Sequence, residues 1–283
     1  MNMQGLSRYR VLWYVGLLFV LSSCAAPENS TTPPTPQTVP QTVRRLPAPP
    51  TAPAAPLRVG VTPNYPPVVF KEQGNITGLE ADLARGVGEA LGRPIAFVEL
   101  GWEALIPALE GGQIDVIMSG MSVTEARQRR VRFVQPYLQI GQMALIRKSD
   151  RVRLGSPSLL LRTRQRVGFE AGSTGETFVK TNIPQAQHVA LASVDAGLQA
   201  LRTGAIDVFI HDAVTIWRLG SEETEDTLTG VFSPLTEEYL AWAVRQSDDT
   251  LRKDLEAVLT RWRGTGRLQE LFQKWLSFHV GVN

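Results

Sequence analysis

The pattern of apolar and polar positions from residue 57 onward predicts strands that alternate with helices. Leu57–Val61 and Ile95–Leu100 are short apolar runs that are typical of buried strands. Between them, an apolar residue returns every fourth position, the spacing of one helix face, and Gly92 then provides a helix stop. The residues of this face are Leu79, Leu83, Val87 and Leu91. Such alternation predicts a mostly parallel sheet, whose ligands bind at the carboxyl ends of the strands.

The stretch Gly112–Arg127 predicts a strand that runs directly into the start of a helix. A short helix over Trp102–Glu110 leads into it, and Ile114–Met118 is an apolar run behind a glycine. Thr124 offers the side-chain oxygen of an N-cap residue, so backbone N–H groups and the positive end of a helix dipole would face the space beyond the strand. Because Arg127 follows within the first turn, this junction is a candidate site for a carboxylate.

The same pattern occurs a second time. Ala-Leu, Gly and Ile-Asp-Val recur in the same order at residues 108–116 and 200–208, and the opening strand Arg58–Val61 is echoed by Arg166–Phe169. The chain is therefore internally duplicated, which predicts two similar α/β lobes whose strand ends face a common cleft.

The two copies end in different chemistry. The first strand ends in Ser119 and Gly120 and leads to Arg127, whereas the second ends in His211 and Asp212. A cation on one wall of a cleft and an anion on the other would fit a zwitterion.

Composition narrows the class of protein. The 283 residues can bury one large core or two lobes, and 43% hydrophobic content excludes a disordered chain. A net charge of +2 is too small to indicate nucleic acid as a partner. The arginines between Arg147 and Arg166 are interpreted as a solvated face, with a docking surface for a membrane partner as the alternative. The three histidines form no metal-ligand cluster and no cofactor loop occurs, so neither a metal nor a cofactor is expected.

The first residues have the pattern of an export signal. Arg8 and Arg10 precede the apolar run Val11–Leu21, which is too short to span a bilayer and has the length of a signal-peptide core. The run ends in Leu-Ser-Ser followed by Cys24, the single cysteine of the chain, and this resembles the lipobox of bacterial lipoproteins. Residues 1–24 are therefore predicted to be a lipoprotein signal peptide, with an ordinary secretory signal or a chance cysteine as the alternative.

Residues 25–56 have the composition of a linker. They hold ten of the nineteen prolines, with almost no large apolar side chains between them. Such a segment cannot bury enough surface to offset its ordering entropy, so we expect a disordered, extended tether between the membrane and the folded body. A proline-motif ligand for a partner domain is the alternative.

From Leu57 to about Phe278 the chain resembles the family 3 solute-binding proteins of ABC importers for polar amino acids. The segments that carry this resemblance occur in the family's order: Val59-Gly60, Tyr65–Pro67, Gly78–Leu83, Trp102–Leu109, Gly120–Thr124 with Arg127, Gly172–Thr174, and Ile206–Val208 with Asp212. Two positions depart from the family pattern, namely Ala81 and the segment Tyr239–Trp242. The second departure lies near a predicted crossing between lobes and concerns the details of closure.

The resemblance implies a two-lobed periplasmic-binding-protein-like fold of type II. It predicts two mixed, mostly parallel sheets, a hinge and an interlobe cleft. Lobe 1 is predicted to comprise residues 57–141 plus 236–283, and lobe 2 residues 142–235. Two crossing segments between discontinuous lobes would permit hinge closure.

The resemblance also implies which residues bind the head group of the ligand. It implies that Arg127 pairs with the α-carboxylate, helped by the backbone N–H of Ser122 and by Ser173 or Thr174 from the other lobe. The alternative for Arg127 is an ordinary surface arginine.

The aspartate that accepts the α-ammonium in the family corresponds to Asp212. The carbonyl of Gly120 and the hydroxyl of Ser122 would assist it. The alternative for Asp212 is a cap of the helix that begins at Ala213.

The resemblance further implies that the ligand side chain lies between two aromatic rings, Tyr65 and Trp102, either of which could instead be ordinary core. Thr62 stands where several relatives have an aspartate that binds a distal amine or amide. Glu170 would line the side-chain pocket from lobe 2 and favour a cationic or amide-bearing guest, or it could point to solvent. Ser119 is a further candidate contact, and His211 is interpreted as a packing or rim residue.

These observations predict a substrate-binding lipoprotein of an ABC importer. Its expected partners are a polar L-amino acid, an inner-membrane permease and the membrane that anchors Cys24, and the protein is expected to be an exported monomer in the periplasm or at the cell surface. An enzyme similar to cyclohexadienyl dehydratases, with Glu170 as general acid, is the runner-up. An amino-acid-sensing module is the third hypothesis.

Overall fold

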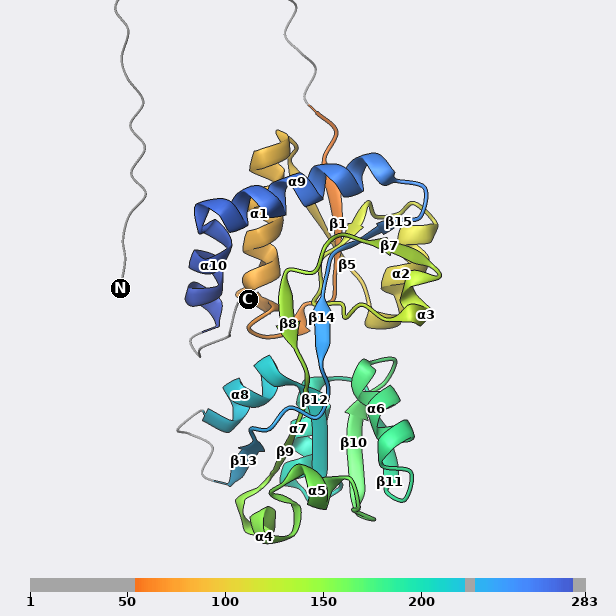
Figure 1. Cartoon of the computed structure of the whole chain (residues 1–283), viewed down its shortest axis with the longest axis vertical. Helices are drawn as coiled ribbons and strands as arrows, with labels where there is room; N and C mark the ends of the chain where they lie inside the picture. Colours follow the sequence, from red (N-terminus) through yellow and green to blue (C-terminus); the bar gives the residue numbers. More distant parts are fainter. Residues whose placement is uncertain (1–53, 222–226, 277–283) are drawn as a thin grey trace, which may run out of the picture. The chain divides into compact units, whose positions relative to one another are not determined.

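The computed structural model describes residues 54–221 and 227–276 and contains two five-stranded mixed sheets with helices on their faces (Figure 1). The predicted signal peptide, Cys24 and most of the predicted linker lie outside the described residues. The first sheet has the order β5-β1-β6-β15-β7, formed by Ile95–Glu99, Leu57–Val61, Val116–Ile117, Ala243–Arg245 and Val131–Phe133. The second has the order β11-β10-β12-β9-β13, formed by Gln187–Leu191, Arg166–Glu170, Val208–Asp212, Gln142–Arg147 and Leu228–Val231.

The two sheets share one topology. In the first, β1 pairs in parallel with β5 and β6, and β6 pairs antiparallel with β15. In the second, β10 pairs in parallel with β11 and β12, and β12 pairs antiparallel with β9. The internal duplication of the sequence is thus a duplication of sheet topology. The alternating two-lobed α/β fold predicted from the sequence is confirmed.

Helices bury apolar side chains on both faces of each sheet. The first sheet has α1 (Leu79–Leu91), α9 (Asp249–Thr265) and α10 (Arg267–Trp275) on one face, and α2 (Leu105–Glu110) on the other. The second has α6 (Thr174–Asn182) with the short helices α4 (Arg151–Leu154) and α5 (Pro157–Leu160) on one face, and α7 (Val194–Arg202) with α8 (Ala213–Ser221) on the other. Among the described residues no helix is long and apolar enough to span a bilayer.

Two short antiparallel strands connect the sheets. The strands β8 (Leu138–Ile140) and β14 (Glu238–Leu240) pair with each other and carry the chain from the first sheet to the second and back (Figure 1). A further small sheet is formed by β2 (Asn64–Tyr65), β3 (Val69–Glu72) and β4 (Asn75–Thr77). The exact lobe boundaries stay a prediction.

The observed bounds of the elements can be compared with those predicted from the sequence. The helix at Leu79–Leu91 is confirmed, and Gly92 ends it with a left-handed φ of 63°. The Trp102–Glu110 segment is divided into a 3₁₀ turn at Trp102–Ala104 and α2. The predicted strand at Ile114–Met118 is shorter than expected, because only Val116 and Ile117 pair with both neighbours.

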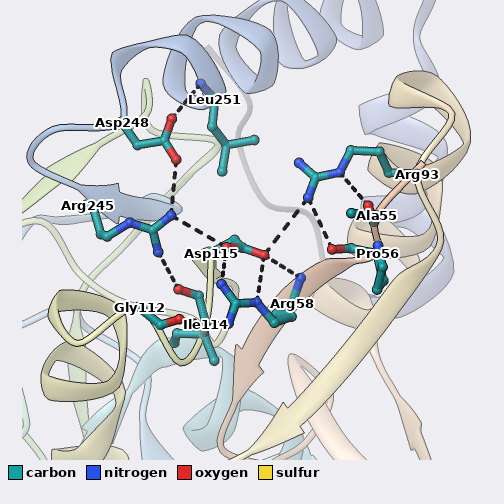
Figure 2. A network of polar contacts seen from close by, with 10 residues as sticks. All are labelled: Ala55, Pro56, Arg58, Arg93, Gly112, Ile114, Asp115, Arg245, Asp248 and Leu251. Carbon is teal, nitrogen blue, oxygen red and sulfur yellow. Dashed lines mark hydrogen bonds and ion pairs between the residues drawn. The ribbon is translucent and has the colours of Figure 1, made fainter.

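An aspartate at the amino end of β6 is held by arginines from the strands on either side (Figure 2). Asp115 accepts hydrogen bonds from Nε and Nη2 of Arg58 at 3.1 and 2.6 Å, and Arg245 approaches it at 3.5 Å. Arg245 also donates to the carbonyl oxygen of Ile114 at 2.6 Å. Burial alone would raise the pKa of Asp115, but the hydrogen bonds and charge of Arg58 keep that pKa below its usual value.

The second sheet repeats this arrangement. Asp207 accepts from Nε and Nη2 of Arg166 at 2.9 and 3.0 Å, and from Nη2 of Arg147 at 2.7 Å. Arg147 also donates to the carbonyl oxygen of Ile206 at 2.8 Å, as Arg245 does to that of Ile114. Each lobe therefore fixes the amino end of its central strand with a planar, bidentate arginine–carboxylate pair. The carboxyl ends of the same strands lead to the candidate site.

Candidate functional site

The carboxyl ends of the central strands line a cavity that draws residues from both lobes. It has about 480 Å³ of empty space, part of which opens to solvent. Its lining residues are Thr62, Asn64, Tyr65, Trp102, Ser119, Gly120, Ser122, Arg127, Gln142, Glu170, Ser173, Thr174, His211 and Asp212. All eleven residues predicted to contact ligand are in this set.

Arg127 is positioned by the helix start that the sequence predicted. Thr124 caps the short helix α3 (Glu125–Gln128), accepting from the Arg127 backbone N–H at 3.2 Å. The guanidinium donates to the carbonyl oxygens of Ser122 at 2.8 Å and Gly172 at 3.3 Å, and lies 5.2 Å from the centre of the Trp102 ring. Burial lowers the pKa of Arg127, but a guanidinium remains charged at any physiological pH.

Asp212 ends β12 and carries the opposite charge into the same cavity. Its carboxylate accepts from the Tyr65 hydroxyl and from the Gln142 amide, each at 2.5 Å. Burial raises the pKa of Asp212, and the charge of nearby Glu238 raises it further, while His211 and the two donors act in the other direction. A cation that met this carboxylate would offset the cost of burying it.

Tyr65 and Gly120 form one wall. Tyr65 is only 8% exposed, and its ring packs on Gly120 so closely that a Cβ there would come within 2.7 Å of a ring carbon. Gly120 also has a left-handed φ of 66°, which favours glycine. Trp102 belongs to lobe 1 and reaches lobe 2, because its indole N–H donates to the carbonyl oxygen of Gly172 at 3.1 Å. Both rings therefore face the cavity.

The predicted side-chain pocket contains a glutamate–histidine pair. Glu170 faces His211, with 3.2 Å between its Oε2 and Nε2 of the ring, and His211 is itself buried in the cavity wall. The interpretation of His211 as a packing or rim residue did not include this pairing. The Thr62 hydroxyl donates to the carbonyl oxygen of Leu100, and its backbone N–H donates to the hydroxyl of Ser119 at 2.9 Å.

The remaining predicted contacts are hydroxyl-bearing residues at strand and helix ends. The Ser122 hydroxyl donates to Glu238 at 2.8 Å. Ser173 caps α6, and the Thr174 hydroxyl accepts from the Gln142 amide at 3.1 Å. The amino end of α6 therefore lines the cavity, where the positive end of the helix dipole favours a negative charge.

Sequence reasoning missed three polar residues of the site. Gln142 and Asn64 line the cavity, but neither belongs to a motif that would have singled it out. Glu80 lies beneath the cavity and is fully buried. It occurs in the Gly78–Leu83 segment that carried the family resemblance, which gave it no role.

Glu80 joins the site to the connecting strands. One carboxylate oxygen accepts from the Gly120 N–H at 3.0 Å and from the Tyr137 hydroxyl at 2.6 Å, and the other accepts from the Trp242 indole at 2.9 Å. Tyr137 and Trp242 flank β8 and β14. Burial raises the pKa of Glu80 to about 7, although the three donors oppose that shift.

Among the described residues no cluster of three histidine, cysteine or acidic side chains is arranged to hold a metal ion. The chemistry of the cavity is that of paired opposite charges, hydrogen-bonding groups and aromatic faces. Such a lining suits a small polar ligand that carries both a carboxylate and an ammonium group.

The profile of the bacterial extracellular solute-binding proteins, family 3, matches residues 57–278. The chain belongs to this family.

Curated relatives are similar over most of their length. The glutamine-binding protein GlnH of an ABC transporter from Bacillus subtilis is 28% identical over 210 residues, which cover 72% of this chain and 74% of that protein. The histidine-binding periplasmic protein of Salmonella typhimurium is 28% identical over 240 residues, which cover 79% and 88%.

Solved structures give the same fold. A binding component of an ABC transporter from Wolinella succinogenes, complexed with lysine, superposes with a TM-score of 0.74 at 30% identity and covers 77% of this chain and 94% of that one. The ancestral amino acid-binding protein AncCDT-1, a precursor of cyclohexadienyl dehydratase, superposes with a TM-score of 0.71 at 30% identity, with 77% and 94% covered.

We predict that Glu80→Gln changes the pH dependence of stability. Because the pKa of Glu80 is raised from 4.5 to about 7 in the folded state, its protonated form stabilises the fold at low pH, and this contribution is lost as pH rises through 7. From pH 5 to pH 8 the wild type should lose about 2 to 3 kcal/mol relative to the variant, which does not titrate. Urea unfolding at both pH values measures this, and a pH-independent difference between the two proteins would contradict the assignment.

Proposed function

We propose that this protein captures a free, polar L-amino acid and delivers it to the permease of an ABC importer in the inner membrane. The observation that carries the proposal is that Arg127 and Asp212, from the matching strand ends of two lobes, line one cavity. A ligand that satisfies both must carry a carboxylate and an ammonium group, as a free amino acid does.

The head group would be held by charge-assisted hydrogen bonds. The carboxylate would meet Arg127, the Ser122 N–H and the amino end of α6 at Ser173 and Thr174, and the ammonium would meet Asp212. Contacts of this kind contribute about 1.5–3 kcal/mol each. Hinge closure around the two connecting strands would exclude water from them, and an affinity near micromolar corresponds to about −8 kcal/mol. The closed form would be the one that a permease recognises.

The side chain of the ligand would lie against Tyr65 and Trp102, with Glu170 and His211 at its polar end. This lining favours a basic or amide-bearing side chain over an aliphatic one, because the buried polar groups need hydrogen-bond partners. Several similar proteins are named for ligands of this class, namely glutamine, histidine and lysine, whereas another is named for L-cystine.

The first test is a thermal-shift screen of the mature protein against the twenty amino acids plus ornithine and citrulline. A ligand that binds only the native state raises the melting temperature. We expect the largest shift from arginine, lysine, histidine, ornithine or glutamine, and loss of that shift in Arg127→Ala. The matched control is Arg129→Ala, which removes an exposed arginine from the end of the same helix.

Two outcomes of this screen would count against the proposal. No shift with any amino acid would contradict it, and so would an unchanged shift in Arg127→Ala. Incubation with prephenate-type substrates tests the enzyme alternative, which product formation would favour.

We further propose that Cys24 is lipidated and that residues 25–56 tether the folded lobes to the membrane as an exported monomer. The support is the apolar run that ends at this cysteine and the proline-rich composition that follows it. Cys24→Ser should move the exported protein from the membrane pellet to the soluble fraction in cell fractionation. Retention of the variant in the pellet would contradict a lipid anchor.

A further inference from the structure

His211 connects the ammonium-binding residue to the side-chain pocket. It precedes Asp212 on β12 and is 7% exposed. Its Nδ1 accepts a hydrogen bond from the Asp212 backbone N–H at 2.8 Å, and its Nε2 lies 3.2 Å from Oε2 of Glu170. The ring is packed edge-on against Tyr65, with centroids 5.4 Å apart, and in a tilted arrangement against Phe209, with centroids 5.6 Å apart. Both ring nitrogens are therefore engaged.

These contacts select one form of the imidazole. A nitrogen that accepts a hydrogen bond carries no proton, so the proton of the neutral ring lies on Nε2 and points to Glu170. A doubly protonated ring would place an N–H at Nδ1 against the N–H of Asp212. The hydrogen bond that holds the Asp212 backbone would then be lost.

We propose that His211 is a positioning residue whose neutral form holds Asp212 for the ammonium group of the ligand, so that capture of the amino acid weakens as pH falls. The inference rests on the proposed function and couples binding of the amino acid to release of a proton from His211.

The groups that face His211 act on the pKa of its ring. Glu170 approaches from β10, Asp212 is its neighbour on β12, and Glu238 lies on β14, while Tyr65 contacts the ring from β2. Burial disfavours the imidazolium, but the hydrogen bond to Glu170 and the three negative charges outweigh it and raise the pKa of His211 above its ordinary value of about 6.5. Arg127, across the cavity, has the opposite sign.

Protonation would harm binding in two ways. It removes the acceptor from the Asp212 backbone, and it puts a second cation beside the carboxylate that the ligand ammonium needs. Conversely, an ammonium at Asp212 favours the neutral ring, so binding lowers the pKa of His211 and releases a proton. A shift of one pKa unit between free and bound protein corresponds to a tenfold change in affinity.

Isothermal titration with L-arginine and L-glutamine at pH 6, 7 and 8 tests the proposal, because neither side chain titrates there. We expect Kd to rise about tenfold from pH 8 to pH 6, with release of up to about one proton at pH 7, measured in buffers of different ionisation enthalpy. Binding with the same Kd at all three pH values would overturn this inference and leave the proposed function intact. If neither ligand binds at any pH, both the inference and this ligand class are wrong.

Variants separate positioning from packing. His211→Asn keeps an acceptor near Nδ1 that does not titrate, so its Kd should stay the same from pH 8 to pH 6 and binding should release no proton. His211→Phe keeps the ring packing but lacks the acceptor, and should bind at least about tenfold more weakly at pH 8. His188→Asn, at a histidine of β11 that lies outside the cavity lining, should keep the wild-type pH profile. A wild-type profile in His211→Phe, or a flat one in His188→Asn, would refute the assignment.

Discussion

Two opposite charges brought into one partly buried cavity are the constraint on which the rest of the structure depends. Arg127 is held by carbonyl oxygens and the Trp102 face, and Asp212 by the hydroxyl of Tyr65 and the amide of Gln142. Each charge is thereby supported by neutral groups that a ligand can supplement, which keeps both available for a zwitterion. Because burying charges costs free energy, these two residues lower the stability of the fold while they leave charged groups in the cavity.

The duplicated arginine–aspartate pairs explain how the strands that lead to Arg127 and Asp212 are kept in place despite this cost. Asp115 and Asp207 fix the amino ends of equivalent strands in the two lobes, through hydrogen bonds with nearly the same geometry. The carboxyl ends of those strands can then differ, one leading to Arg127 and the other ending in Asp212. Glu80 adds a buried link between Gly120 in the cavity wall and the residues that flank both connecting strands.

Much of this could be predicted from the sequence, because periodicity, helix signals and repetition are local or recurrent patterns. The helix at Leu79–Leu91, the Thr124 cap and the duplicated topology follow from such patterns. What could not be predicted depends on contacts between distant segments. Nothing near Gln142 indicates that its amide meets Asp212, and no spacing shows that Glu170 and His211 face each other from neighbouring strands. The charge balance of the pocket therefore emerges only in three dimensions.

The central claim is that the opposed charges of Arg127 and Asp212 recognise the two ends of one amino acid. A crystal structure of the mature lobes with the amino acid that gives the largest thermal shift tests it most directly. The account predicts the ligand carboxylate within hydrogen-bond distance of the Arg127 guanidinium and its ammonium within hydrogen-bond distance of the Asp212 carboxylate, in the same cavity. A ligand bound elsewhere, or one in this cavity that contacts only one of the two residues, would contradict it.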